Sequence, residues 1–254
     1  MERWGEAPSS TGDERALTPK GRGALTHARA SVRRIDDLGR DLADDALVVR
    51  LERAVRRFRL QSAHNLLDEA FATYAPDALL AQVGQPLLDR LQAKPDDGAL
   101  RFATSLLDSR LLAHARGWER ASGPLVVLGC TPSEERTLEL IVLGIALAEA
   151  HCRIAYLGAA TPVDLLVEEV RSAQASAVVL QAERVHLTRF EIAQLRALPV
   201  PLVFIGAAAA TLARSTHATA VNPASPTTSA RVAGLARRES SRRSDEPSPS
   251  RPAT

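Results

Sequence analysis

Apolar positions in the first half of the chain recur with the period of an α-helix. Between residues 44 and 117 they return every three or four positions, which places them on one face of each predicted helix. The first stripe consists of Leu47, Val48, Leu51, Ala54, Val55 and Phe58. Ser62 is the predicted N-cap of a second helix. Pro76-Asp77 precedes a third helix, and a turn over 94–98 precedes a fourth. Four amphipathic helices with short connections predict a helical bundle over residues 31–118.

The pattern changes after Trp118. Short apolar runs without alternation follow one another at 125–128, 153–157, 177–180 and 202–205, with a weaker fifth at 218–221. Such runs are typical of parallel strands that are buried on both faces. Helical segments are predicted between them, at about 133–150, 162–174 and 187–197. We therefore expect an α/β plus α fold, in which the four-helix bundle is followed by a flavodoxin-like or Rossmann-like parallel sheet over residues 123–221.

Both ends of the chain are polar and lack periodicity. Residues 1–30 are predicted to form a disordered arm, and residues 222–254 a disordered tail. Residues 31–38 could begin a helix.

Composition sets few limits on function. The 254 residues are 45% hydrophobic but only 4% aromatic, so the core must be aliphatic, and the net charge is +2. Cys130 and Cys152 form neither a metal spacing nor a disulfide framework. No apolar run reaches membrane-spanning length, and the first residues lack the apolar stretch of a signal peptide. We expect a cytoplasmic protein that does not enter a membrane.

Three segments join a strand, a turn and a helix start, at 123–137, 155–162 and 176–180. The most specific is Tyr-Leu-Gly-Ala-Ala-Thr-Pro, at 156–162. These segments resemble cobalamin (B12)-binding domains, and are most similar to the light-sensing, B12-dependent regulators of the MerR class. The resemblance covers residues 31–221. It implies the B12-binding fold and a corrin held between bundle and sheet, so cobalamin is the candidate cofactor.

The family turn reads Asp/Glu-x-His-x-x-Gly, and its histidine binds cobalt. Here Glu135, Thr137 and Leu140 occupy the acid, histidine and glycine positions. A threonine hydroxyl is a poor substitute for imidazole as a cobalt ligand. The sequence therefore predicts no metal ligand at Thr137 and no cobalamin binding in the histidine-ligated manner.

Other family positions also differ. The segment that lines the cofactor tail is Gln181-Ala-Glu183 instead of Ser-x-Leu, and the Gly-Gly after the fourth strand is Gly206-Ala207. In the bundle, a gap-free alignment puts Pro95, Ser105 and Leu106 where the photoreceptors have Trp and Glu-His. The positions equivalent to the cofactor-binding residues of the family are Glu135, Thr137, Gly158, Gln181 and Gly206.

Two further residues are candidates near the same edge of the sheet. His186 follows the third predicted strand and could replace the missing cobalt ligand. Cys130 ends the first predicted strand, where a helix N-terminus could activate its thiol. The alternatives are a surface histidine and a buried, inert cysteine, and the sequence favours these.

The sequence has no nucleophile elbow, phosphate-loop lysine or zinc spacing, so we do not expect the protein to be an enzyme. Residues 1–30 are too short and polar for a helix-turn-helix, so we do not expect base-specific recognition of DNA. Together these features predict a degenerate cobalamin-binding-domain regulator that acts through protein–protein contacts in transcriptional control. Its expected partner is a second copy or a related full-length regulator. The alternatives are a cobalamin sensor without a histidine ligand, a corrinoid carrier for a methyltransferase, and a remnant of a longer regulator.

Overall fold

Residues 44–93 and 96–245 are described by the structure, which is a computed structural model. The predicted arm (1–30) and the helix start at 31–38 lie outside these residues. Among the described residues, those from Leu47 onward belong to one compact unit. None of the described helices combines the length and the apolar character that crossing a membrane requires.

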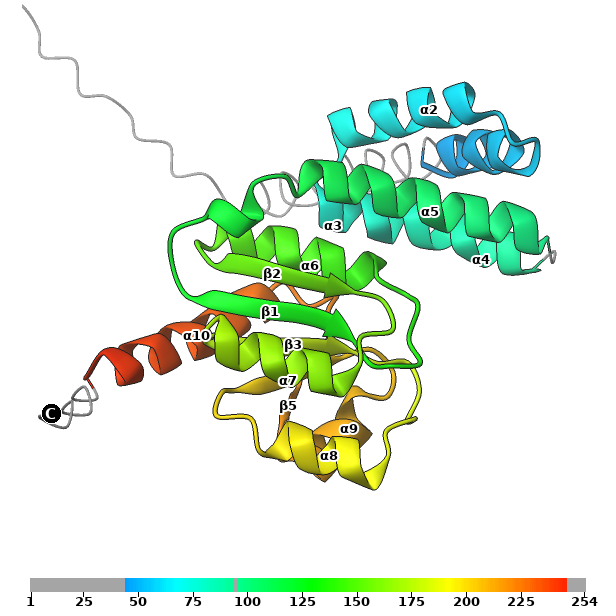
Figure 1. The fold of residues 1–254 in the computed structure, drawn as a ribbon. Helices are drawn as coiled ribbons and strands as arrows, with labels where there is room; N and C mark the ends of the chain where they lie inside the picture. Colours follow the sequence, from blue (N-terminus) through cyan, green and yellow to red (C-terminus); the bar gives the residue numbers. More distant parts are fainter. Residues whose placement is uncertain (1–43, 94–95, 246–254) are drawn as a thin grey trace, which may run out of the picture. The chain divides into compact units, whose positions relative to one another are not determined.

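The first part of the described chain is helical, as the apolar periodicity predicts (Figure 1). A helix over 44–56 is followed by α2 (Leu60–Thr73), α3 (Pro76–Leu79), a π-helical turn η1 (Leu80–Gly84), α4 (Gln85–Ala93) and α5 (Asp97–His114). Asp96 caps α5, because its carboxylate accepts a hydrogen bond from the backbone N–H of Ala99 at 3.1 Å. The third predicted helix is continuous through α3, η1 and α4.

The predicted N-cap at Ser62 is wrong. Helix α2 begins at Leu60, so Ser62 lies within its first turn. The preceding helix ends at residue 56, two residues before Phe58, because Phe58 adopts a left-handed backbone (φ 51°) and reverses the chain. Arg59 then serves as the N-cap residue without a side-chain capping bond.

A parallel sheet follows, in the order β2-β1-β3-β4-β5. Its strands are β1 (Leu125–Cys130), β2 (Arg153–Gly158), β3 (Ala177–Gln181), β4 (Leu202–Ile205) and β5 (Thr219–Ala220). A 3-10 turn, η2 (Trp118–Arg120), leads into β1. The helices that connect or follow the strands are α6 (Leu138–Glu149), α7 (Val163–Ser172), α8 (Arg189–Arg196), α9 (Ala209–Thr216) and α10 (Thr228–Asp245). All five predicted strands are therefore present, whereas α9 was not predicted.

Helix α6 is apolar on every side and belongs to two cores. Leu138, Ile141 and Ile145 pack into the core of the helical bundle. The opposite side of α6 packs on the sheet through Leu140, Leu143 and Leu147. A helix with apolar residues all round is stable only when it is buried. Accordingly, α6 lies between α5 and the strands in Figure 1.

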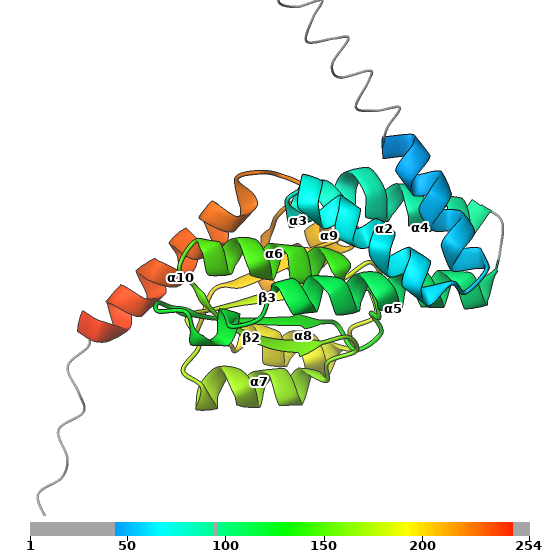
Figure 2. The same ribbon diagram turned by 90° about the horizontal axis from the view of Figure 1, so that it is seen from above.

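The predicted disordered tail over 222–254 is wrong for residues 228–245, which form α10. Val232, Ala233 and Ala236 are fully buried there, in the same core as Val203 and Ile205 of β4. Figure 2 shows α10 lying alongside α6. The segment looks polar because only one narrow, mostly alanine stripe faces the sheet. Residues 246–254 lie outside the described residues.

Candidate functional site

The carboxyl ends of β1 and β3 form the switch point of the sheet. Helix α6, which follows β1, covers one face, whereas α8, which follows β3, covers the other. The loops after the two strands, 131–137 and 182–188, therefore diverge. Doubly wound sheets bind ligands at this point.

Glu134 ties three loops together at this edge. Its Oε1 accepts a hydrogen bond from the backbone N–H of Arg136 (2.8 Å), and its Oε2 accepts one from the N–H of Glu183 (2.9 Å). Its carbonyl accepts the N–H of Ala160 in the loop after β2, at 2.8 Å. The side chain is buried. The predicted helix 133–150 therefore starts only at Leu138, because this loop is held open by hydrogen bonds that a helix would not allow.

Gln181 supports the start of α6. Its side chain is buried, and its Oε1 accepts the N–H of Leu140 at 3.2 Å, one of the N-terminal donors that a helix leaves unpaired. Its Nε2 donates to Oε2 of Glu139 at 3.4 Å. Gln181 is thus a positioning residue for α6.

Thr137, where the sequence resemblance implies a cobalt ligand, is the N-cap residue of α6 but makes no capping bond with its side chain. Its hydroxyl instead donates a hydrogen bond of 2.7 Å to Oδ1 of Asp108 on α5. Nearby, the ring of Tyr156 of β2 packs against that of Trp118, with 5.6 Å between ring centroids. The hydroxyl of Thr137 therefore joins α5 of the bundle to the start of α6.

Burial governs the ionisation of this group. It raises the pKa of Asp108 above its ordinary value, and the hydrogen bond from Thr137 acts in the opposite direction. Burial also raises the pKa of Tyr156 to about 12.

Cys130 is a buried cysteine and His186 a surface histidine, the two alternatives that the sequence favours. Cys130 is fully buried, and its Sγ donates to the carbonyl of Arg136 at 3.4 Å. Burial, followed by the charges of Glu134 and Asp108, raises the pKa of its thiol to about 12. This is the opposite of thiolate activation. His186 is exposed in the loop before α8.

The turn after β4 is closed by an acidic side chain. Gly206 has a left-handed backbone (φ 95°), and a Cβ there would lie 2.6 Å from Oε1 of Glu183. Oε2 of Glu183 accepts the N–H of Ala207 at 3.4 Å. Burial, together with the charge of Glu183, raises the pKa of Glu139. These carboxylates would repel the phosphate of a nucleotide tail.

A cavity of about 180 Å³ lies between the bundle and this edge of the sheet. Binding pockets for drug-sized molecules usually measure about 300–1,000 Å³, and a corrin is larger than most of these ligands. Its lining residues are Leu80, Gln85, Leu88, Gln92, Leu100, Thr104, Arg136, Leu138, Glu139 and Gln181.

The aligned bundle positions do not line this cavity. Ser105 is exposed and Leu106 is in the bundle core, whereas Leu100 and Thr104 supply the lining from α5. Pro95 lies outside the described residues.

The five family-equivalent positions have different surroundings. Thr137 and Gln181 are buried and hydrogen-bonded, and Gly158 and Gly206 form left-handed strand ends. Glu135 is exposed, and the acid built into the loops is its neighbour Glu134. The sequence did not identify Glu134 or Asp108 as site residues. Nothing in the linear pattern shows that Glu134 links loops by hydrogen bonds, or that Asp108 bonds to Thr137, 29 residues away.

These residues do not fit a cobalamin held by histidine in this arrangement. The hydroxyl that replaces the imidazole is engaged by Asp108, the cavity is small, and the carboxylates of Glu139 and Glu183 lie at the cavity and at the turn after β4. Among residues 44–93 and 96–245, no group of three or more His, Cys, Asp or Glu side chains is placed to hold a metal ion.

Comparison with known proteins identifies the fold. No family model and no curated protein matches the sequence. A monomethylamine corrinoid protein from Methanosarcina barkeri is similar in structure, with a TM-score of 0.57, 13% identity, and coverage of 77% of this chain and 99% of that chain. The helical bundle followed by the parallel sheet is thus the fold of a corrinoid protein, as the sequence predicts.

Two further structures match less closely. The methanol:cobalamin methyltransferase complex MtaBC from Methanosarcina barkeri has a TM-score of 0.38 at 12% identity, covering 80% of this chain and 86% of that chain. A cobalamin-binding protein from Desulfitobacterium hafniense DCB-2 has a TM-score of 0.33 at 14% identity, covering 70% and 93%.

Proposed function

We propose that this protein is a regulator built on the corrinoid-protein fold, which acts through protein–protein contacts and not by holding cobalamin through a histidine. The observation that carries the proposal is the hydrogen bond from Thr137 to Asp108. It uses the group at the ligand position to fasten α5 onto α6. The sequence resemblance to light-sensing regulators supports a role in transcriptional control, with a second copy or a related full-length regulator as the partner.

Apolar packing adds to this closure. Leu138, Ile141 and Ile145 of α6 are buried among the bundle helices. Exposing each such side chain costs about 1.5–3 kcal/mol. Separating α6 from the bundle helices would expose all three to water and break the bond to Asp108. The closed arrangement therefore favours a protein whose surface, and not its cleft, does the work.

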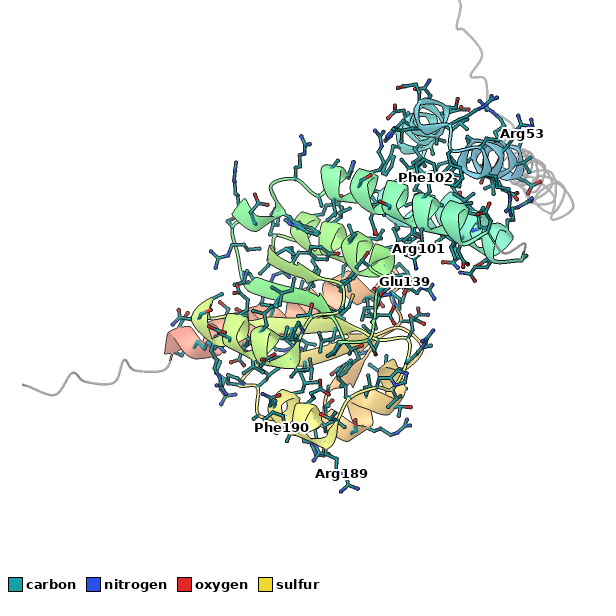
Figure 3. All side chains as sticks on the ribbon, turned by 45° about the vertical axis from the view of Figure 1, so that its right-hand side comes forward. Arg53, Arg101, Phe102, Glu139, Arg189 and Phe190 are labelled. Carbon is teal, nitrogen blue, oxygen red and sulfur yellow. The ribbon has the colours of Figure 1, made fainter. Side chains whose placement is uncertain are left out.

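A surface for such contacts lies on the α7–α8 side. Phe190 at the start of α8 is 72% exposed, Val185 in the preceding loop 51%, and Leu165 of α7 49%. Helices α7 and α8 pack against each other. Phe190 is labelled in Figure 3. We infer that these side chains contribute to one apolar patch, since contiguous exposed apolar patches mark protein-binding surfaces.

Two experiments test this proposal. Light scattering of the purified protein, alone and mixed with a candidate full-length regulator, should show an assembly that Phe190→Ser weakens. The control, Leu112→Ser, removes an exposed apolar side chain from α5 instead and should leave the assembly intact. A monomer that binds neither itself nor the regulator would refute the contact role.

The second experiment measures the absorption spectrum after incubation with hydroxocobalamin or adenosylcobalamin and gel filtration. We expect no retained corrinoid. Thr137→His should be measured beside it, because it restores the missing ligand. Retention by the wild-type protein would overturn the proposal in favour of the second candidate.

That second candidate is a corrinoid carrier or a cobalamin sensor. It is favoured by the similarity to the Methanosarcina barkeri corrinoid protein, 99% of which is covered. For this role the hydrogen bond between Thr137 and Asp108 would have to open and a lower ligand would have to come from elsewhere.

A further inference from the structure

An unusual density of arginine marks the turn between the first described helix and α2. Residues 47–59 contain Arg50, Arg53, Arg56, Arg57 and Arg59 against one acid, Glu52. This stretch therefore carries a charge of +4, whereas the full chain carries +2. Clustering of arginines on one part of the surface is the electrostatic footprint of a polyanion partner.

Four of these arginines surround one hollow of about 340 Å³. Its lining residues are Arg50, Arg53, Ala54, Arg57, Arg59, Ser62, Asn65 and Leu66. Three of the arginines (Arg53, Arg57 and Arg59) are exposed and make no ion pair or hydrogen bond through their guanidinium groups within the described part of the chain. Arg50 pairs with Glu69 at 3.4 Å, between two half-exposed side chains, an interaction of small energy.

The polar lining of the hollow consists of hydrogen-bond donors. The guanidinium groups only donate, and they match the geometry of phosphate oxygens. Ser62 adds a hydroxyl that can donate. The Oδ1 of Asn65 accepts from Gln61 at 2.9 Å, and the NH₂ group of Asn65 can only donate. No carboxylate lines this space, so an anion would meet no like charge there.

The backbone fixes the arginines around the hollow. The N–H of Arg59 bonds to the carbonyl of Ala54, and the N–H of Phe58 to that of Val55, both at 2.9 Å. These two bonds form a Schellman motif, which normally has glycine in the left-handed position. Phe58 occupies it at φ 51°, a strained conformation for a bulky residue. Its ring is held against Phe102, with 5.6 Å between centroids.

A second hollow of about 440 Å³ extends the basic surface. It is lined by Val49, Glu52, Arg53, Arg56 and Arg57, so Arg53 and Arg57 border both spaces. Glu52 is already neutralised by Arg56 at 2.9 Å and by Arg90 at 3.7 Å. Two adjoining hollows with shared arginines fit successive phosphates of a chain better than one compact anion.

We propose that this arginine surface binds the phosphate backbone of a nucleic acid without reading its sequence. Arg53 and Arg57 contact neighbouring phosphates, and Arg50, Arg59, Ser62 and Asn65 complete one of the two positions. Backbone contacts of this kind give affinity and orientation but no base preference. The proposal does not depend on the contact role proposed above.

The test measures fluorescence anisotropy of a labelled 25-base-pair duplex of arbitrary sequence at several salt concentrations. Each phosphate contact contributes about 0.9 to the slope of log K against log salt. Arg53→Gln/Arg57→Gln should therefore reduce the slope by about 1.8. The control, Arg184→Gln/Arg189→Gln, removes the same charge from exposed arginines near and on α8 and should leave the slope unchanged; Arg53 and Arg189 are labelled in Figure 3.

Three results would overturn the proposal. The first is no binding of the duplex by the wild-type protein at 50 mM salt. The second is an equal fall in slope for both double variants, which would mean that only net charge matters. The third is calorimetric binding of inorganic triphosphate without binding of the duplex, which would make the hollow a site for a small oligophosphate. Circular dichroism melting should confirm that the variants, altered only at exposed side chains, remain folded.

Discussion

The hydroxyl of Thr137 and the carboxylate of Asp108 are joined by a hydrogen bond of 2.7 Å between α6 and α5. The pair connects the element that follows the first strand to the last helix of the bundle. Because Asp108 is partly buried, its oxygen has fewer water donors and relies in part on this hydroxyl. The residue at which the resemblance implies a metal ligand here forms a hydrogen bond between two helices instead.

Thr137→Val should therefore lower the free energy of unfolding by about 1–3 kcal/mol, since it leaves the carboxylate without its hydroxyl donor. Urea denaturation measures the change. The control is Thr73→Val, whose hydroxyl bonds only the carbonyl of Glu69 within its own exposed helix, with an expected change within about 0.5 kcal/mol. Equal effects of the two substitutions would contradict this account.

Glu134 and Glu135 offer a comparison between adjacent acids. Glu134→Ala removes the acceptor of two backbone N–H groups, those of Arg136 and Glu183, and should cost about 1–3 kcal/mol. Glu135→Ala alters an exposed side chain and should stay within about 0.5 kcal/mol. Hydrogen exchange should also speed up at Arg136 and Glu183 in the first variant alone. Unchanged exchange at Arg136 and Glu183 would show that the hydrogen bonds to Glu134 do not protect these two amides.

The pKa of Glu139 predicts how stability depends on pH. Burial, then Glu183, raises this pKa above 4.5, so the folded protein holds the proton more tightly than the unfolded chain does. Its contribution to stability is therefore present at low pH and is lost as pH rises from 4.5 through the raised value.

Glu139→Gln removes that loss. The variant should be more stable than the wild-type protein at pH 7, and the difference should vanish below pH 4. Thermal melts at several pH values measure it, with the exposed Glu149→Gln as the control. A difference that does not vary with pH would rule out ionisation of Glu139 as the cause.

Helix α10 should be part of the folded unit. Val232→Asp places a charge in a fully buried position and should cost about 3 kcal/mol or more. Ser241→Asp, on the exposed side of the same helix, should have little effect. Chemical denaturation compares them. If both variants unfold like the wild-type protein, α10 does not pack on the sheet in solution.

Elements with a strong apolar signal could be predicted from the sequence. The runs at Leu125–Cys130 and Ala177–Gln181 are buried throughout, so their composition alone identifies central strands. Helix α10 was missed, because only four of its residues are buried, two of them alanines, and its remaining sequence, rich in arginine and serine, is equally typical of a disordered tail. Side-chain partners such as Asp108 depend on how two distant helices meet, which a linear pattern does not contain.

Helix α6 supplies apolar side chains to the bundle with one side and to the sheet with the other. The bundle and the sheet should therefore not melt independently, since unfolding either one would expose the apolar side chains that α6 buries in it. Heat or denaturant should give one cooperative transition over residues 47–245. A substitution that destabilises either the bundle or the sheet would then lower the stability of the whole folded unit.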